Sequence, residues 1–249
     1  MKNVLVIIIV LVLLGIATFL FFHYRDSILA PKEKVAEQTT QPQAPTITIE
    51  NKTIKDSTKP FSIDIAYPFI GSLVDFNQKI QTIINKEIDE FKANSLANDK
   101  TVQETDPQGY ANYPREYDLK MTYTKGEVDQ NTVSVIFAVS NFTGGAHGAN
   151  YFIPFNYDVK NSKEIALADL FPNQTNYLQK ISDYCTKDLN QQIATRLGSA
   201  EGTWVKDGAN PKAENFSSFL INKDTIVFYF PQYQVAPYAA GDFKVTMPR

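Results

Sequence analysis

The feature that most restricts the fold is an uncharged apolar run of 19 residues, Val4–Phe22, close to the N-terminus. A helix of that length extends roughly 30 Å, which matches the hydrocarbon thickness of a bilayer. The run is longer than the apolar region of a typical cleaved signal peptide, and no cysteine lies near its end to carry a lipid. We therefore predict that residues 1–25 form an uncleaved, single-pass transmembrane anchor.

The next segment, residues 26–45, has the composition of a flexible linker. It is rich in Pro, Gln, Lys and Glu and contains no aromatic residue. The positive-inside rule compares Lys2 and the terminal amine with Arg25, Lys32 and Lys34, and it does not favour export of the C-terminal part of the chain. The residues alone therefore leave the topology open.

Residues 46–249 have the composition of a globular domain. The whole chain has a formal charge of −3 and no basic block, which argues against a nucleic-acid partner. One cysteine cannot form an intrachain disulfide, and two histidines with one cysteine are too few for a zinc site of the Cys/His type. We expect no metal, no cofactor and a fold that is held together by its apolar core.

Alternation of apolar and polar residues predicts most of the secondary structure in this domain. Strands are expected over Thr46–Ile54, Phe61–Tyr67, Glu116–Thr124, Thr132–Ser140, Ala149–Asp158, Phe216–Leu220, Thr225–Phe230 and Phe243–Met247. The segment Ala166–Pro172 (ALADLFP) is expected to be a turn that places its leucines and phenylalanine in the core.

Apolar residues at steps of three and four predict two main helices. The first begins near a capping-box-like Ser72-Leu73-Val74-Asp75 and runs for about six turns. The second covers Asn176–Leu197, with Gly198 as its C-terminal cap. Residues Ala93–Tyr113 lose the periodicity and predict a long loop. The result is an α+β fold, in which two helices pack on a mostly antiparallel sheet, with subdomains at 46–115 and 116–249.

Two segments differ from ordinary connections. Asn141–Gly148 (NFTGGAHG) contains three glycines, which permit positive φ and close approach of a ligand. Phe230–Gly241 (FPQYQVAPYAAG) contains rigid tyrosines of the kind found at binding surfaces. The structural alternatives are a strained connection in which His147 satisfies buried backbone groups, and a proline-fixed loop packed on the sheet edge. The candidate ligand contacts are Thr143, Gly145, His147, Pro231, Tyr233, Pro237 and Tyr238.

We assign no catalytic residue from these patterns. A histidine-dependent nucleophile would have to use His147, because His23 adjoins the apolar run. Cys185 falls on the apolar face of the second helix, and the G-x-S-x-G motif is absent. Paired carboxylates are left open, because such pairs form only in three dimensions. We therefore expect that the chain is not an enzyme.

The order of AYPFIGSLVDFNQKIQ, NFTGGAHG, FNYDVKNSKEIALADLF and FPQYQVAPYAAG resembles a family of paired bacterial extracytoplasmic domains of DUF4163 and DUF3298 type. They occur in RsiV-like anti-sigma factors and ahead of the catalytic domain of PdaC-like peptidoglycan deacetylases. The resemblance covers about 46–249. It implies a DUF4163-like segment at 46–115, a DUF3298-like, RsiV C-terminal-like segment at 116–249, and an extracytoplasmic location for both.

The resemblance also implies what to expect of function. RsiV-like proteins bind lysozyme outside the cell and hold a sigma factor through a cytoplasmic segment. Only Met1–Asn3 precede the apolar run here, so we expect no such segment, and we expect no separate deacetylase domain because the chain ends at Arg249.

We therefore expect a protein of the bacterial cytoplasmic membrane, inserted through residues 4–22. Its outer domain would be a binding or sensing module for a lysozyme-like muramidase or for peptidoglycan. One alternative is a cell-wall hydrolase that uses His147 as general base, which needs a Ser, Asp or Glu side chain beside His147 in a cleft. The other is an RsiV-like signalling regulator.

Overall fold

The computed structural model describes residues 47–112, 115–198 and 203–249. The predicted transmembrane anchor at residues 1–25 and the predicted linker at 26–45 lie outside these ranges. No helix within the described ranges is both long enough and apolar enough to cross a membrane.

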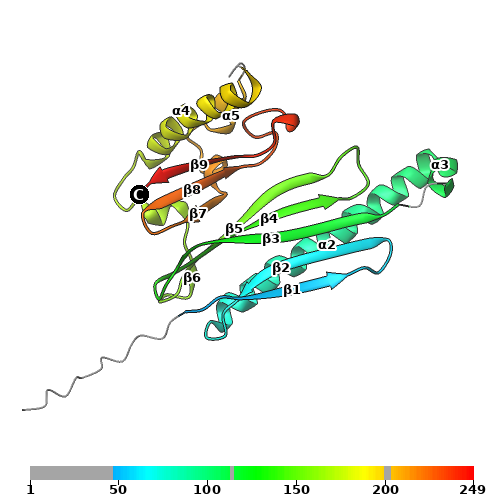
Figure 1. Ribbon diagram of the computed structural model, residues 1–249, viewed down its shortest axis with the longest axis horizontal. Helices are drawn as coiled ribbons and strands as arrows, with labels where there is room; N and C mark the ends of the chain where they lie inside the picture. Colours follow the sequence, from blue (N-terminus) through cyan, green and yellow to red (C-terminus); the bar gives the residue numbers. More distant parts are fainter. Residues whose placement is uncertain (1–46, 113–114, 199–202) are drawn as a thin grey trace, which may run out of the picture. The chain divides into compact units, whose positions relative to one another are not determined.

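Six strands form a mixed sheet in the order β1-β2-β3-β4-β5-β6 (Figure 1). Every neighbouring pair is antiparallel except β2 and β3, which run parallel with Phe61 opposite Tyr117. Parallel neighbours need a crossover connection, and helix α2 supplies it. The strands are β1 (Glu50–Asp56), β2 (Phe61–Phe69), β3 (Tyr117–Val128), β4 (Thr132–Phe142), β5 (Ala149–Asp158) and β6 (Lys163–Glu164).

Helix α2 (Val74–Thr105) covers one face of this sheet, and its apolar residues Phe76, Ile80, Ile84 and Phe91 are buried there. The predicted capping box is wrong, since Leu73 occupies the N-cap without a side-chain bond. The side chain of Asn77 instead accepts from the N–H of Ile70, at 2.9 Å, and donates to its carbonyl, at 2.8 Å.

The loop predicted over Ala93–Tyr113 is also wrong. Helix α2 continues to Thr105, and the short helix α3 (Pro107–Asn112) comes next. The last turns of α2 contact the rest of the fold through polar side chains. The sequence there therefore lacks the apolar residues at steps of three and four that predict a helix. The Asn98 amide donates to the carbonyl of Thr143 at 2.8 Å, and the Tyr117 hydroxyl donates to Asp99.

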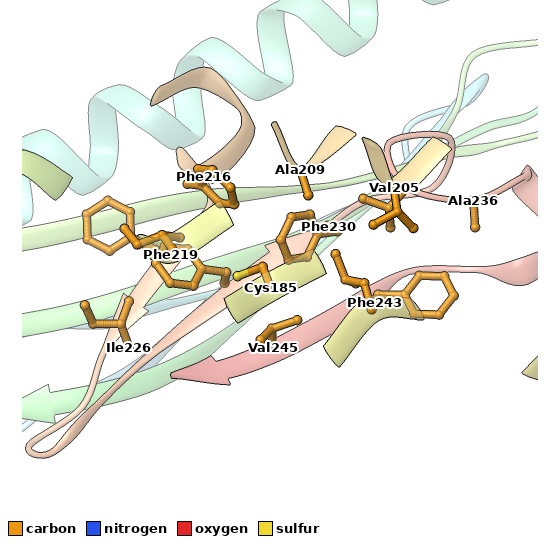
Figure 2. Packing of buried hydrophobic residues seen from close by; sticks show 14 of the residues in the cluster. Cys185, Val205, Ala209, Phe216, Phe219, Ile226, Phe230, Ala236, Phe243 and Val245 are labelled. Carbon is orange, nitrogen blue, oxygen red and sulfur yellow. The ribbon is translucent and has the colours of Figure 1, made fainter. Parts of the chain in front are cut away.

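A second, antiparallel sheet contains β7 (Phe219–Ile221), β8 (Thr225–Phe230) and β9 (Phe243–Pro248). The helices α4 (Tyr177–Leu197) and α5 (Trp204–Gly208) contribute to its core cluster, part of which is shown in Figure 2. Gly198 ends α4 at φ 82°, as predicted. The ALADLFP turn forms a short 3-10 helix, Leu167–Leu170, whose first leucine is buried in the same cluster.

The two sheets also contact each other directly. Leu220 of β7 and Tyr229 of β8 form a small buried cluster with Ile136 of β4. The edge strand β7 is bonded to the larger sheet by two buried polar side chains. Ser134 Oγ accepts from the N–H of Ile221 at 2.8 Å, and Asn156 Nδ2 donates to the carbonyl of Phe219 at 3.1 Å.

The α+β prediction is confirmed, with the refinement that the large sheet is mixed. Strands on both sides of the predicted boundary between residues 115 and 116 share that sheet, and the boundary itself stays a prediction.

Cys185 offers a direct test of the α4 packing. Burial, together with the nearby charge of Asp188, raises the pKa of its thiol from 9.0 to about 12. Because only the thiolate reacts readily, Ellman's reagent at pH 8 should leave the folded protein unlabelled and should label one thiol per chain in urea. The thiol loses its proton more readily in the unfolded chain than in the folded one. The free energy of unfolding should therefore fall as the pH rises above 9. Equal labelling rates with and without urea would contradict this packing.

Candidate functional site

The connection between β4 and β5 lies beside the segment between β8 and β9. The hydroxyl of Tyr233 and Nε2 of His147 are 3.2 Å apart. The ring centroids of His147 and Tyr238 are separated by 4.2 Å, and those of the two tyrosines by 5.4 Å. Three of the seven candidate contacts therefore meet in one group, which we call the His-Tyr cluster (His147, Tyr233 and Tyr238).

Hydrogen bonds to the backbone hold the β4–β5 loop in place. Gly144 adopts φ 94°, a conformation that glycine tolerates best, and Arg115 donates to its carbonyl at 3.1 Å. Asn98 of α2 donates to the Thr143 carbonyl and, at 3.2 Å, to its hydroxyl. Gly148 leaves no room for a side chain, since a Cβ there would lie 2.8 Å from the carbonyl oxygen of Asn141.

Buried residues of the core cluster hold the segment between β8 and β9 in place. Val235, Ala236 and Ala240 are buried in the cluster that α4 covers. The Gln234 amide donates to the carbonyls of Gly208, at 2.8 Å, and of Asn215, at 2.9 Å. These contacts fix the backbone between the two tyrosines and just after Tyr238.

Tyr233 combines strain with exposure. Its φ of 69° lies in the left-handed region, and half of the residue's surface is accessible. For a bulky side chain this conformation costs on the order of 1–3 kcal/mol, and such strain concentrates at functional positions. The fold thus holds an aromatic ring outward at an energetic cost.

The other four candidate contacts lie in the same two loops but outside the His-Tyr cluster. Thr143 is bonded to Asn98 of α2, and the carbonyl of Pro231 accepts from the N–H of Gln234 at 3.1 Å. Pro237 is exposed, and its carbonyl accepts from the N–H of Ala240 at 2.9 Å. Gly145 is exposed and has no positive φ. In the described ranges, these four residues take no part in the ring contacts of the His-Tyr cluster.

His147 is exposed, so the alternative in which it satisfies buried backbone groups does not hold. Its Nδ1 lies 2.9 Å from the carbonyl oxygen of its neighbour Gly148, and its Nε2 faces the Tyr233 hydroxyl. A tyrosine therefore stands where the hydrolase hypothesis expected a serine or an acid. Among the described residues, no three His, Cys, Asp or Glu side chains are grouped closely enough to hold a metal ion.

One contact that joins the two loops has no signal in the sequence. Asn150, just after the β4–β5 loop, donates through its side chain to Gln232 at 3.0 Å. The two residues are 82 positions apart, and both belong to types that are common on any surface.

The fold is that of solved proteins of the DUF3298 family. A member from Bacteroides fragilis superposes with a TM-score of 0.52 at 19% identity, over 82% of this chain and 92% of that one. A DUF3298 family protein from Pseudomonas aeruginosa gives a TM-score of 0.50 at 13% identity, over 82% and 91%. At these identities the likeness concerns the fold alone.

Two family models match successive parts of the chain. Residues 54–150 match the model described as deacetylase PdaC, and residues 168–249 match DUF3298, a protein of unknown function. The matches support the resemblance to DUF3298 and PdaC proteins. The assignments to DUF4163 and to RsiV-like proteins stay predictions.

Curated relatives extend this result. The peptidoglycan-N-acetylmuramic acid deacetylase PdaC of Bacillus subtilis is 27% identical over 203 residues, which make up 81% of this chain and 40% of the deacetylase. An esterase of Mycobacterium tuberculosis is 29% identical over 127 residues, 51% of this chain and 53% of the esterase. The chain thus spans about half or less of the length of these two relatives.

The expectation that the chain is not an enzyme is overturned by these names. The model that matches residues 54–150 is described as a deacetylase, and the relative is named for deacetylation of peptidoglycan. Counts of histidine, cysteine and serine motifs do not exclude activity, because catalytic side chains can come together only in the folded chain.

Proposed function

We propose that this chain is a bacterial envelope protein whose described domain acts at peptidoglycan. In this proposal residues 4–22 anchor it in the cytoplasmic membrane, and the domain lies outside the cell. The peptidoglycan deacetylase relative supports the assignment to the envelope.

The observation that carries the proposal is the convergence of the His-Tyr cluster on an exposed surface. Tyrosine rings offer a flat apolar face and a polar edge at low entropic cost, which suits a ligand with alternating apolar and hydroxyl-bearing faces. Sugar rings have that character. The strained Tyr233 and the neighbouring ring of Tyr238 would form the platform, and the Tyr233 hydroxyl, 3.2 Å from His147 Nε2, would supply a hydrogen-bonding oxygen.

Sedimentation with purified sacculi tests this proposal. The full chain in detergent should pellet with sacculi, and Tyr233→Ala combined with Tyr238→Ala should weaken binding at least tenfold, which corresponds to about 1.4 kcal/mol. Tyr184→Ala is the matched control, because this tyrosine is also exposed but lies on α4.

Undiminished pelleting of the double variant would contradict the role of the cluster. If the wild-type chain did not bind sacculi but bound lysozyme, the ligand would be the muramidase and the peptidoglycan proposal would fail.

Hydrolysis of an acyl group on peptidoglycan is the second candidate. The names of the deacetylase and esterase relatives favour it, although His147 has the Tyr233 hydroxyl beside its Nε2 in place of the Ser, Asp or Glu side chain that the hydrolase hypothesis required. A general base typically contributes 10²- to 10⁴-fold to a rate. Acetate release from N-acetylated wall glycan should therefore fall about 100-fold or more in His147→Gln. Release that is absent from the wild-type chain, or unchanged in the variant, would remove this candidate.

A further inference from the structure

A groove of about 290 Å³ opens on the face of the six-stranded sheet that α2 does not cover. Lys120 and Thr122 of β3, Ser140 of β4 and Asn150 of β5 line it from the sheet. Asp242, the residue before β9, and Lys244 of β9 line it from the other side. We call it the sheet-face groove.

Strand register connects this groove to the His-Tyr cluster. Lys120 pairs with Ser140, and Ser140 pairs with Asn150, so the three side chains form one row across β3, β4 and β5. Asn150 ends the row and donates to Gln232, the residue before Tyr233. A ligand bound on the cluster can therefore extend along the row without leaving polar surface.

The groove has an excess of positive charge. Its lining includes two lysines and one acid, Asp242. Within the described ranges, Lys120 makes no ion pair, and the neighbouring Asp64 pairs with Lys55 at 3.3 Å. The ammonium of Lys244 lies 5.4 Å from the ring centroid of Tyr229 and is likewise without an acidic partner there.

Three further polar side chains of the lining can donate hydrogen bonds, and Ala138, Val139 and Phe152 give the groove apolar surface as well. The hydroxyls of Thr122 and Ser140 and the amide of Asn150 can each donate to an oxygen of a bound molecule. Charge-assisted bonds from ammonium groups to a carboxylate are stronger than bonds between neutral groups. A cavity of about 300 Å³ is at the small end of ligand sites, so it suits one short anionic segment.

We propose that the sheet-face groove binds the carboxylate-bearing peptide stem of a peptidoglycan fragment whose sugars lie on the His-Tyr cluster. This proposal rests on the proposed function, because it adds a second, charge-selective subsite to the same surface. Lys120 and Lys244 neutralise the stem carboxylate from opposite walls. Ser140 and Asn150 bond to the backbone amides of the stem.

Two soluble probes separate the subsites. One is a disaccharide–tripeptide muropeptide, and the other is chitobiose, which has two N-acetylated sugars but no peptide. Calorimetry on the full chain in detergent should show tighter binding of the muropeptide, with an affinity that falls as salt increases. Lys120→Met combined with Lys244→Met should weaken muropeptide binding at least tenfold and leave chitobiose binding unchanged. Lys160→Met, at an exposed turn after β5, is the matched control.

The outcomes separate this proposal from the proposed function. If the lysine double variant binds the muropeptide as well as the wild-type chain does, the groove has no such role, although binding to sacculi can still stand. If neither the sacculi nor the probes bind, both proposals fail. Unchanged thermal unfolding of the double variant shows that a loss of affinity is not a loss of fold.

Discussion

Gly208→Ala should destabilise the part of the fold built on the three-stranded sheet and displace the segment that carries Tyr233 and Tyr238. A Cβ on Gly208 would lie 1.8 Å from the carbonyl oxygen of Gln234 and 3.0 Å from a methyl group of Val235. Backbone cannot yield as a flexible side chain does, so the whole segment has to move. Overpacking of this kind costs about 3 kcal/mol.

Urea unfolding, followed by thiol labelling of Cys185, measures this loss. The displaced tyrosines should also reduce pelleting with sacculi, although Gly208 does not belong to the cluster. Gly71→Ala is the control, because the nearest atom to its added Cβ is 4.0 Å away, an ordinary contact. A Gly208→Ala protein with wild-type stability would show that the segment does not pack closely against α5.

Gly126→Ala should lower the free energy of unfolding by a similar amount, because it disrupts the contact between β3 and β7. A Cβ at this position would lie 2.2 Å from the carbonyl oxygen of Ile221 and 2.9 Å from Cγ of Leu220. The close approach of β3 to β7 depends on the missing side chain, and an added methyl group would push the two sheets apart. We expect the free energy of unfolding to fall by about 3 kcal/mol.

The same labelling assay reports this change, with Gly145→Ala as control, since the atom nearest to that added Cβ is 3.9 Å away. Unlike Gly208, Gly126 does not contact the tyrosine segment, so the fraction of protein that stays folded should bind sacculi with wild-type affinity. An unfolding midpoint that equals the wild-type value would contradict the close contact between the sheets.

The spacing of apolar residues predicted those helices and strands that bury one regular face. The strand predicted over Ala149–Asp158 coincides with β5, and α4 ends at its predicted glycine cap. The extension of α2 was missed because it is held by Asn98 and Asp99 through polar contacts, which leave no apolar stripe. Alternation also says nothing about which strand a strand pairs with, so the parallel pair of β2 and β3 could not be derived.

The candidate site was predicted in part. Glycine, proline and tyrosine content singled out both loops, and with them His147, Tyr233 and Tyr238. Their convergence is a tertiary fact that depends on how the two sheets pack. The sequence pattern does not single out the two lysines of the groove. Lys120 and Lys244 lie in alternating strands, where exposed polar residues are expected on any solvated face.

The His-Tyr cluster joins residues from both matched segments, with His147 inside 54–150 and the tyrosines inside 168–249. A homologue that kept only one of these segments would lose part of the surface, whatever its own stability. Selection on this surface should therefore act on the segments as a pair. Across an alignment of two-segment relatives, changes at position 147 should covary with changes at 233 and 238.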